Sequence, residues 1–285
     1  MSSLYVVSTP IGNLEDITQR ALRILGEADR VLAEDTRRTA ILFKRYGITT
    51  PLVSAHAHNE AGRAAQVVGW LEAGETVALV SDAGTPLLSD PGARIVTDVI
   101  AAGHDVVPVP GASALLSALV GAGFDTAAFT FLGFPPRSGR DRKAVLERVA
   151  GLDHTVVLYE APPRVHALLV DLAAVCEDGR RAVVARELTK IHETFQRGTL
   201  AELARYYEEA PPRGEVVVLV EGGTGGRAMA VEDPAAVAHG LLAEGGRPSG
   251  VARELARRLG LSRNEAYEIV LAAAAAVNPE SGEPE

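Results

Sequence analysis

Short apolar runs alternate with longer stretches of helical periodicity through the first 109 positions of the chain. The runs are rich in β-branched residues and lack polar alternation, which is typical of strands buried on both faces of a parallel sheet. They lie at residues 4–7, 31–33, 51–54, 76–80 and 105–109. Four helices are predicted between them, and three of these end at glycines: Gly47, Gly74 and Gly103. The pattern predicts an α/β domain over residues 1–112.

A second alternating unit is predicted over residues 113–222. Its expected strands lie at 128–132, 155–159, 182–185 and 215–220. Its expected helices lie at 115–122, 144–150, 165–175 and 200–208. Several of these segments are able to pair antiparallel, so we expect a mixed sheet. A glycine- and proline-flanked cationic segment, residues 133–143, interrupts the pattern and predicts a flexible loop.

The C-terminal part has a different composition. Residues 223–232 predict a glycine-rich linker. Residues 233–277 predict three short helices resembling a helix-turn-helix, with a basic face that includes Arg257 and Arg258. The last residues, 278–285, predict a disordered tail.

Composition sets limits on the function. A chain of 285 residues with 47% hydrophobic and 23% charged residues is typical of a soluble globular protein. No apolar run is long enough to cross a bilayer and no secretory signal is visible, so we expect a cytoplasmic protein with no membrane partner. A net charge of −9 argues against a general nucleic-acid coat protein but allows a local basic patch.

The segment SDAGTPLLSDPG at 81–92 follows the predicted strand 76–80. Ligands of open α/β sheets collect at the carboxyl ends of the strands, where this loop is expected. Gly84 and Gly92 allow tight turns, and Asp82 and Asp90 supply carboxylates without a nearby cation. A phosphate-binding loop needs the opposite charge. The loop therefore favours a ligand with positive charge or hydroxyls, and a rigid acidic turn without a ligand is the alternative.

Eight motifs, in this order, resemble one known family, the bacterial small-subunit ribosomal RNA cytidine-2′-O-methyltransferases of the tetrapyrrole methylase superfamily. They are STPIGNLEDIT at 8–18, AEDTR at 33–37, HNE at 58–60, VSDAGTP at 80–86, DPG at 90–92, PVPG at 108–111, GFPP at 133–136 and ARELTK at 185–190. The resemblance extends from about residue 3 to 222, and more loosely through the C-terminal module.

The resemblance implies two α/β domains with a cofactor cleft between them, usually in a homodimer, and S-adenosylmethionine as methyl donor. Cofactor contacts are then expected from Pro10, Asp82, Ala83, Gly84, Ser113, Ala114, Tyr159 and Leu188. The substrate implied is ribosomal RNA in the small ribosomal subunit. RNA contacts are expected from Arg137, Arg140, Arg142, Lys143, Arg257 and Arg258.

A base that removes the proton of the ribose 2′-hydroxyl must come within hydrogen-bond reach of it. The catalytic candidates are Glu60, Glu187 or a deprotonated Lys190, with His58 and Asp35 as further possibilities, and the sequence does not choose among them. No metal is expected, since His56, His58 and Glu60 lack a further close ligand.

Two other functions compete. A tetrapyrrole methyltransferase of the same fold should carry a GAGPG-like loop after its first strand, where this chain has STPIG at 8–12. A ligand-sensing nucleic-acid-binding regulator without catalysis should carry a stronger DNA-binding surface than the short, alanine-rich module at 233–277.

Overall fold

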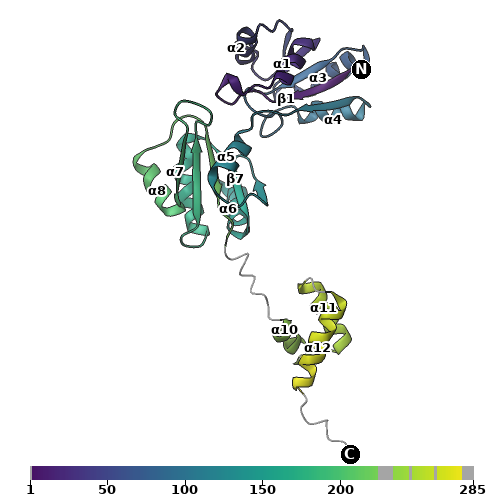
Figure 1. Ribbon diagram of the computed structural model, residues 1–285, viewed down its shortest axis with the longest axis vertical. Coiled ribbons are helices and arrows are strands. Elements are labelled where there is room, and N and C mark those ends of the chain that lie inside the picture. The colour runs from purple at the N-terminus through teal and green to yellow at the C-terminus, as the bar shows by residue number, and fades with distance from the viewer. Residues whose placement is uncertain (1, 224–233, 244–245, 260–261, 278–285) are drawn as a thin grey trace, which may run out of the picture. The chain divides into compact units, whose positions relative to one another are not determined.

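The computed structural model describes residues 2–223, 234–243, 246–259 and 262–277 (Figure 1). The chain divides into two compact units, Met1–Gly223 and Thr224–Glu285. The first unit contains two five-stranded sheets, and the described part of the second is helical.

The first sheet is entirely parallel, as predicted. Its strand order is β3-β2-β4-β1-β5. The strands are β1 (Ser3–Val7), β2 (Arg30–Ala33), β3 (Leu52–Ser54), β4 (Val77–Val80) and β5 (Asp105–Val109). The central strands β4 and β1 lie side by side, so the loops that follow them meet at one edge of the sheet.

Helices cover both faces of this sheet, which explains the continuous apolar strands. They are α1 (Gln19–Glu27), α2 (Thr36–Tyr46), α3 (Glu60–Glu72) and α4 (Ala93–Ala101), with a short 3₁₀ helix η1 (Leu14–Asp16) before them. Ala78 and Val80 pack in one cluster with Leu25 of α1. Val77 and Leu79, which point to the other face, pack with residues of α3 and α4.

The second sheet is mixed, as predicted, because β6 and β7 are parallel while the remaining pairs are antiparallel. Its order is β6-β7-β10-β8-β9. The strands are β6 (Phe129–Phe131), β7 (Thr155–Glu160), β8 (Arg181–Arg186), β9 (Thr194–Thr199) and β10 (Val216–Val220). The sequence pattern missed β9, because this edge strand reads TFQRGT and has only one large apolar residue.

This sheet is also buried on both faces. Its helices are α5 (Ala114–Ala122), α6 (Gly139–Gly151), α7 (Val165–Val175) and α8 (Leu200–Glu209), with a 3₁₀ turn η2 (Pro162–Arg164) before α7. Leu115 and Leu119 of α5 share a core cluster with Val157 and Leu219 on one face. On the other face Val218 belongs to the cluster that contains residues of α6, α7 and α8.

The predicted cationic loop is wrong in its second half, because α6 begins at Gly139. Arg142 is therefore a helical residue, and it lies on the same face as the buried residues Leu146 and Val149, four and seven positions later. Its side chain is 10% exposed and forms an ion pair with Asp171 at 2.6 Å. The Arg142 guanidinium is buried and already paired, which does not suit the contact with RNA that the sequence predicted for it.

The second unit contains the three predicted helices: α10 (Pro234–Ala243), α11 (Pro248–Leu259) and α12 (Arg263–Val277). Ala238, Val251, Leu255 and Val270 form its core. The side chains of Arg257 and Arg258, residues 224–232 of the predicted linker and the predicted tail lie outside the described residues. Among the described helices, none combines the length and apolarity needed to cross a membrane.

Arg180 is a buried cation that ties the second sheet to α6. Its side chain is 2% exposed and donates to the carbonyl oxygens of Leu152 (3.0 Å), Val149 (3.3 Å) and Glu221. Replacing it by Met removes these three hydrogen bonds together with the ion pair between Arg180 and Glu177 at 2.6 Å. We expect Arg180→Met to lower the free energy of unfolding by about 3–5 kcal/mol, the usual cost of breaking a buried charged network.

Urea unfolding measures this loss, and the neighbouring Arg181→Met provides the control. The side chain of Arg181 is 61% exposed and pairs with Glu221, so its loss should cost less than about 1 kcal/mol. Equal losses in the two variants would contradict the role given to Arg180.

Candidate functional site

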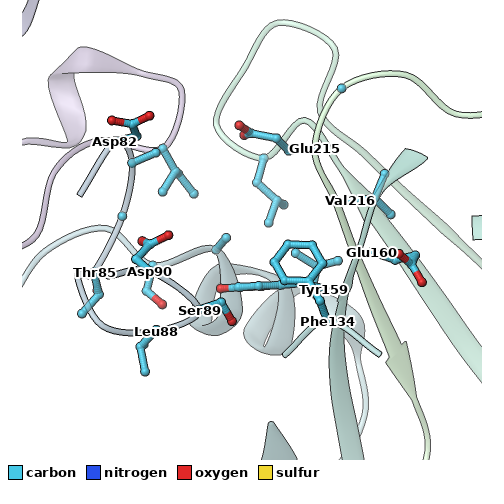
Figure 2. A pocket seen from close by; sticks show the side chains of 18 of the residues that line it. Asp82, Thr85, Leu88, Ser89, Asp90, Phe134, Tyr159, Glu160, Glu215 and Val216 are labelled. Carbon is cyan, nitrogen blue, oxygen red and sulfur yellow. The ribbon is translucent and has the colours of Figure 1, made fainter. Parts of the chain in front are cut away.

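A cavity of about 320 Å³ lies between the two sheets of the first unit (Figure 2). One wall is the loop at 81–92 that follows β4, and the opposite wall comes from the ends of β7 and β10. Most of the residues predicted to contact a cofactor line it: Asp82, Ala83, Gly84, Ser113, Ala114, Tyr159 and Leu188. Pro10 is not part of the lining, whereas its neighbour Ile11 is. The two distant halves of the sequence therefore meet where the motifs predicted.

The turn at Gly84 is fixed by the backbone of the first loop. The amide of Thr9 donates to the Gly84 carbonyl at 2.9 Å, and the amide of Gly84 donates to the Thr9 carbonyl at 3.0 Å. Gly84 has a φ of 81°, a left-handed conformation that favours glycine. A Cβ atom there would lie 3.1 Å from the Ile11 side chain. Glycine is therefore required both by its φ and by the close approach of Ile11.

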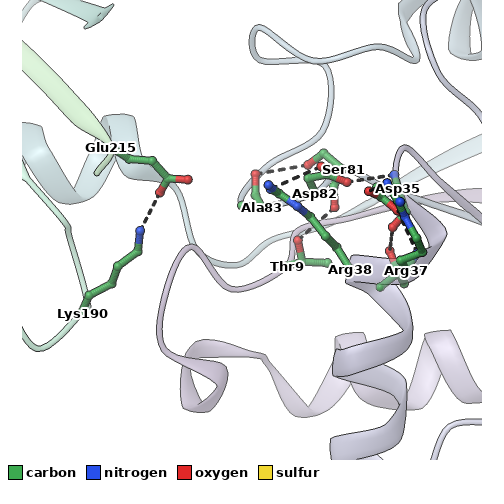
Figure 3. A network of polar contacts seen from close by, with 10 residues as sticks. Thr9, Asp35, Arg37, Arg38, Ser81, Asp82, Ala83, Lys190 and Glu215 are labelled. Carbon is green, nitrogen blue, oxygen red and sulfur yellow. Dashed lines mark hydrogen bonds and ion pairs between the residues drawn. The ribbon is translucent and has the colours of Figure 1, made fainter. Parts of the chain in front are cut away.

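The Asp82 side chain is bound by residues at the start of α2. Its Oδ1 accepts a hydrogen bond from the Asp35 amide at 2.9 Å, and its Oδ2 lies 3.4 Å from an Arg38 guanidinium nitrogen (Figure 3). Hydrogen bonds from the side chain and backbone of Arg37 lower the pKa of Asp35 to about 2. Asp35 thus stays ionised and begins α2 as its N-cap, which suits a structural anchor of this wall.

Two loops at the site contain strained backbone. Leu87 and Ser89 have φ values of 74° and 72°, and Glu187 and Thr189 have values of 52° and 65°. In the described part of the chain, these are the non-glycine residues with positive φ. Such conformations cost about 1–3 kcal/mol each and cluster at functional sites. The positive φ values therefore indicate that the loops at 87–89 and 187–189 belong to the functional site.

Asp90 and Glu160 both line the cavity, although the sequence analysis named Asp90 only as a carboxylate of the loop at 81–92 and did not name Glu160. Figure 2 shows Asp90 on the wall that carries Asp82, opposite Tyr159. Burial, together with the charge of Asp82, raises the pKa of Asp90 against a hydrogen bond from Ser81. Asp90 is the first residue of the DPG motif at 90–92, but nothing in the sequence pattern indicated that its side chain is half-buried.

The opposite wall is aromatic and apolar. The Tyr159 ring lies 5.5 Å from the Phe134 ring and 4.8 Å from that of Phe131. Burial raises the pKa of the Tyr159 hydroxyl, which therefore stays protonated at neutral pH. Leu188 and Val217 continue this wall and belong to the core cluster under α5. The cavity thus places Asp82 and Asp90 opposite a wall of aromatic and aliphatic side chains that also contains Glu160 and Glu215.

The family model of the tetrapyrrole (corrin/porphyrin) methylases matches residues 3–204 of the chain. A relative from Synechocystis sp., named ribosomal RNA small subunit methyltransferase I, is 42% identical over 273 residues, which cover 95% of this chain and 98% of the relative. A relative of the same name from Thermotoga maritima is 43% identical over 222 residues, which cover 78% of this chain and 99% of the relative.

The chain belongs to the ribosomal RNA small subunit methyltransferase I family. Because the Thermotoga relative is matched over almost its whole length, the remaining part of this chain has no counterpart in it. Among solved structures, a cobalt precorrin-4 methyltransferase is similar with a TM-score of 0.60 and 19% identity, covering 77% of this chain and 94% of that protein. That likeness shows the fold alone.

Glu60, a predicted catalytic residue of this family member, lies outside the cavity lining. Its Oε1 accepts from the amides of Gly92 (3.0 Å) and Arg94 (2.8 Å), so it caps α4 from another helix. The same carboxylate therefore holds the end of the strained loop. The His56 and His58 rings lie 5.9 Å apart, and within the described ranges no three His, Cys, Asp or Glu side chains form a group able to hold a metal.

Glu187 and Lys190, the other predicted catalytic residues, are paired with each other. Lys190 Nζ lies 2.8 Å from Glu187 Oε1. It also lies 3.1 Å from Glu215 Oε2, the contact drawn in Figure 3. Burial alone would lower the pKa of Lys190, but its hydrogen bonds to the two carboxylates outweigh this and raise it. A deprotonated Lys190 does not fit this arrangement. Of these three residues, only Glu215 lines the cavity.

Three cations that follow the cavity wall remain exposed: Arg137, Arg140 and Lys143, here called the cationic turn. Lys143 lies 3.6 Å from Glu147 on the surface of α6, a weak pair because both side chains are mostly exposed. Of the four cations predicted to contact RNA in this segment, three are therefore exposed and Arg142 is buried.

Replacing Gly84 by Ala tests the geometry of the loop without any ligand. The added Cβ meets both the unfavourable φ and Ile11, so we expect the free energy of unfolding to fall by about 1–3 kcal/mol. Chemical denaturation measures it. Gly69→Ala in α3 is the control, because an added Cβ finds nothing within 4 Å there. That helical substitution should stabilise the protein by about 0.5–1 kcal/mol, and the same sign in both variants would contradict the analysis.

Proposed function

We propose that this chain transfers the methyl group of S-adenosylmethionine to the ribose 2′-hydroxyl of a cytidine in small-subunit ribosomal RNA. The observation that carries the proposal is the cavity between the two sheets, which has Asp82 and Asp90 on one wall and mainly apolar side chains, with Glu160 and Glu215 among them, on the other. It lies in a chain 42% identical over nearly its full length to a relative named ribosomal RNA small subunit methyltransferase I.

The residues present fit this cofactor. S-adenosylmethionine bears a sulfonium, an ammonium and ribose hydroxyls, and it supplies an electrophilic methyl group when bound. Asp82 offers a carboxylate to the cationic end, and the neighbouring backbone of Ala83 and Gly84 is held open by the positive φ of Gly84. Leu188, Val217 and the other apolar residues of the opposite wall suit a heteroaromatic ring. Ser113 and Ala114 lie at the start of α5 between the two walls.

Asp90 is the residue that we propose as the proton acceptor for the 2′-hydroxyl. It lines the cavity, and burial has raised its pKa, so its carboxylate is more basic than an exposed one. Glu60 and Glu187 are less suitable, since their carboxylates already accept backbone hydrogen bonds outside the lining. Around Asp90, the titratable or charged groups are Asp82, Glu34 and Tyr159.

The cationic turn extends the proposal to the RNA. Its three exposed cations follow Phe134, which lines the cavity, by three to nine residues, so we assign them to the phosphates that flank a bound nucleotide. We also propose that the protein acts in the cytoplasm, where bacterial ribosomal subunits are made, and that it is a homodimer, as the family resemblance implies. Sedimentation of the purified protein tests the dimer.

A tetrapyrrole acceptor is less well supported. The solved structure of a tetrapyrrole methyltransferase that this chain resembles is only 19% identical to it, whereas the relatives named for ribosomal RNA are more than twice as similar.

The first prediction concerns the reaction itself. With radiolabelled S-adenosylmethionine, the protein should label the RNA of small ribosomal subunits purified from a strain that lacks its relative, and ribose-methylation mapping should place the label on a cytidine. Asp82→Asn should weaken cofactor binding, measured by calorimetry, by about tenfold or more, since a hydrogen bond to a charged group contributes about 1.5–3 kcal/mol.

Asp98→Asn is the control, because Asp98 pairs with Arg94 on the exposed side of α4 at 3.5 Å. Its cofactor affinity should equal that of the wild type. Adding a metal chelator should not change the cofactor affinity of either variant. Unaltered binding in Asp82→Asn would remove Asp82 from the proposed cofactor site, and label on a tetrapyrrole instead of RNA would overturn the function.

The second prediction is a pH profile. A base acts only when deprotonated, so methylation should decline as the pH falls through the pKa of Asp90, which lies above its ordinary value. Asp90→Asn should reduce kcat by about 10²-fold and remove this acid limb. If Asp90→Asn instead loses cofactor affinity with kcat preserved, Asp90 is a cofactor contact and the assignment as base is wrong.

The third prediction concerns the cationic turn. Replacing Arg137, Arg140 and Lys143 by Ala should weaken RNA binding and reduce the slope of log affinity against log salt by about 2, because each phosphate contact in single-stranded RNA contributes about 0.7 to the slope. Cofactor affinity should stay the same. Arg23→Ala, which removes an exposed cation of α1 that pairs with Glu27, is the control, and a salt slope equal to it would contradict the proposal.

A further inference from the structure

Phe134 is an exposed aromatic residue at the edge of the cavity. Its side chain is 54% exposed, although one side of the ring packs against Tyr159 with centroids 5.5 Å apart. Figure 2 shows the two residues together on the wall opposite Asp82 and Asp90. A single exposed apolar side chain is ordinary on protein surfaces. What distinguishes Phe134 is the way in which its backbone is held.

Two arginines grip the segment that follows it. Arg164 Nη2 donates to the Pro135 carbonyl at 2.8 Å, and Arg142 Nη1 donates to the Pro136 carbonyl at 3.1 Å. Both cations are themselves anchored, Arg142 by Asp171 at 2.6 Å and Arg164 by Glu160 at 3.1 Å.

The two carboxylates that anchor these arginines differ in exposure, since the Asp171 side chain is 42% exposed. The Glu160 side chain is fully buried, at 0% exposed, so its charge depends on Arg164 for compensation. On the other side of Phe134, the Gly133 carbonyl accepts from the Tyr159 amide at 2.9 Å. The backbone is thus bound to β7 before Phe134, and to arginines of η2 and α6 after it.

The prolines add stiffness. Pro135 and Pro136 have a fixed φ, and Pro135 is buried. The Phe134 ring is therefore presented to solvent on a backbone that cannot fold it away. An aromatic side chain fixed in this manner loses little conformational entropy when a planar ligand stacks on it.

The neighbourhood identifies the ligand. The first residue of the cationic turn, Arg137, lies three positions after Phe134, and the other two, Arg140 and Lys143, lie in α6. An aromatic face next to backbone-tracking cations is the arrangement with which proteins hold single-stranded nucleic acid, by stacking a base and pairing the phosphates. A base displaced from its stack also gives the protein access to its ribose.

We propose that Phe134 is the stacking platform for the base of the ribonucleotide that is methylated, and that Arg164 is the positioning residue that holds this platform. The inference rests on the proposed function and adds the residue that receives the acceptor. It separates the two ligands of the cavity, because Phe134 and the cationic turn serve the RNA while Asp82 to Gly84 serve the methyl donor.

Three variants at position 134 test the platform: Phe134→Leu, Phe134→Tyr and Phe134→Ala. Stacking on an aromatic ring contributes about 1–3 kcal/mol per base, so the Leu and Ala variants should lower kcat/KM for the small-subunit substrate by about 5- to 150-fold. The Tyr variant should keep it, since the ring is preserved. All three should bind S-adenosylmethionine like the wild type in calorimetry, and melt like it because the side chain is exposed.

The outcomes are distinct. Equal activity of the Leu and wild-type proteins, or a loss shared by Tyr, overturns stacking. A loss of cofactor affinity in the Leu variant would show that the ring contacts the cofactor instead of the RNA base. Each comparison is the ratio of the variant's kcat/KM or cofactor affinity to that of the wild-type protein. A wild-type protein that binds the cofactor but does not label ribosomal RNA defeats the proposed function itself.

Arg164→Gln tests the positioning role. It removes the ion pair with Glu160 and the donor to Pro135, so the platform should loosen while the Phe134 ring stays present. We expect kcat/KM for RNA to fall as in Phe134→Leu, and Phe134→Leu combined with Arg164→Gln to lose little more. Fully additive losses in the double variant would show that Arg164 acts independently of Phe134.

Discussion

The site depends on backbone strain that carboxylates hold in place. The loops at 87–89 and 187–189 contain residues in left-handed conformations that L-amino acids rarely adopt. Glu60 binds the amides of Gly92 and Arg94 just after the first of these loops, and Glu187 binds Lys190 and the amide of Glu215 around the second. The carboxylates that the sequence suggested as bases thus stabilise the loops that form the cavity walls.

Much of the fold could be predicted from the chain. The two-sided apolar strands indicated a parallel sheet covered by helices, and the structure has one. Strand β9 could not be predicted in this way, because an edge strand with one exposed face and polar pairing has no strong apolar period. The residues predicted to contact a cofactor also converge on the cavity, except Pro10.

The roles of individual charges were harder to predict, because burial depends on tertiary contacts. Arg137, Arg140, Arg142 and Lys143 look alike in the sequence, yet the helical register of α6 turns only Arg142 toward the core. Asp90 and Glu60 are both acids next to motifs, but one faces the cavity and the other caps a helix. A local pattern gives the residue type and its face on an element, whereas the elements packed against it decide its partner.

The strand order of the second sheet has a consequence for biosynthesis. The first sheet is complete once β5 ends at Val109, so it can fold while the rest of the chain is being translated. The second cannot, because its central strand β10, between β7 and β8, is the last to be made. A nascent chain that ends before Val220 therefore has the acidic wall of the cavity, formed by the first sheet, but not the complete opposite wall. The two walls become one cavity only when β10, the last strand to be made, is inserted between β7 and β8.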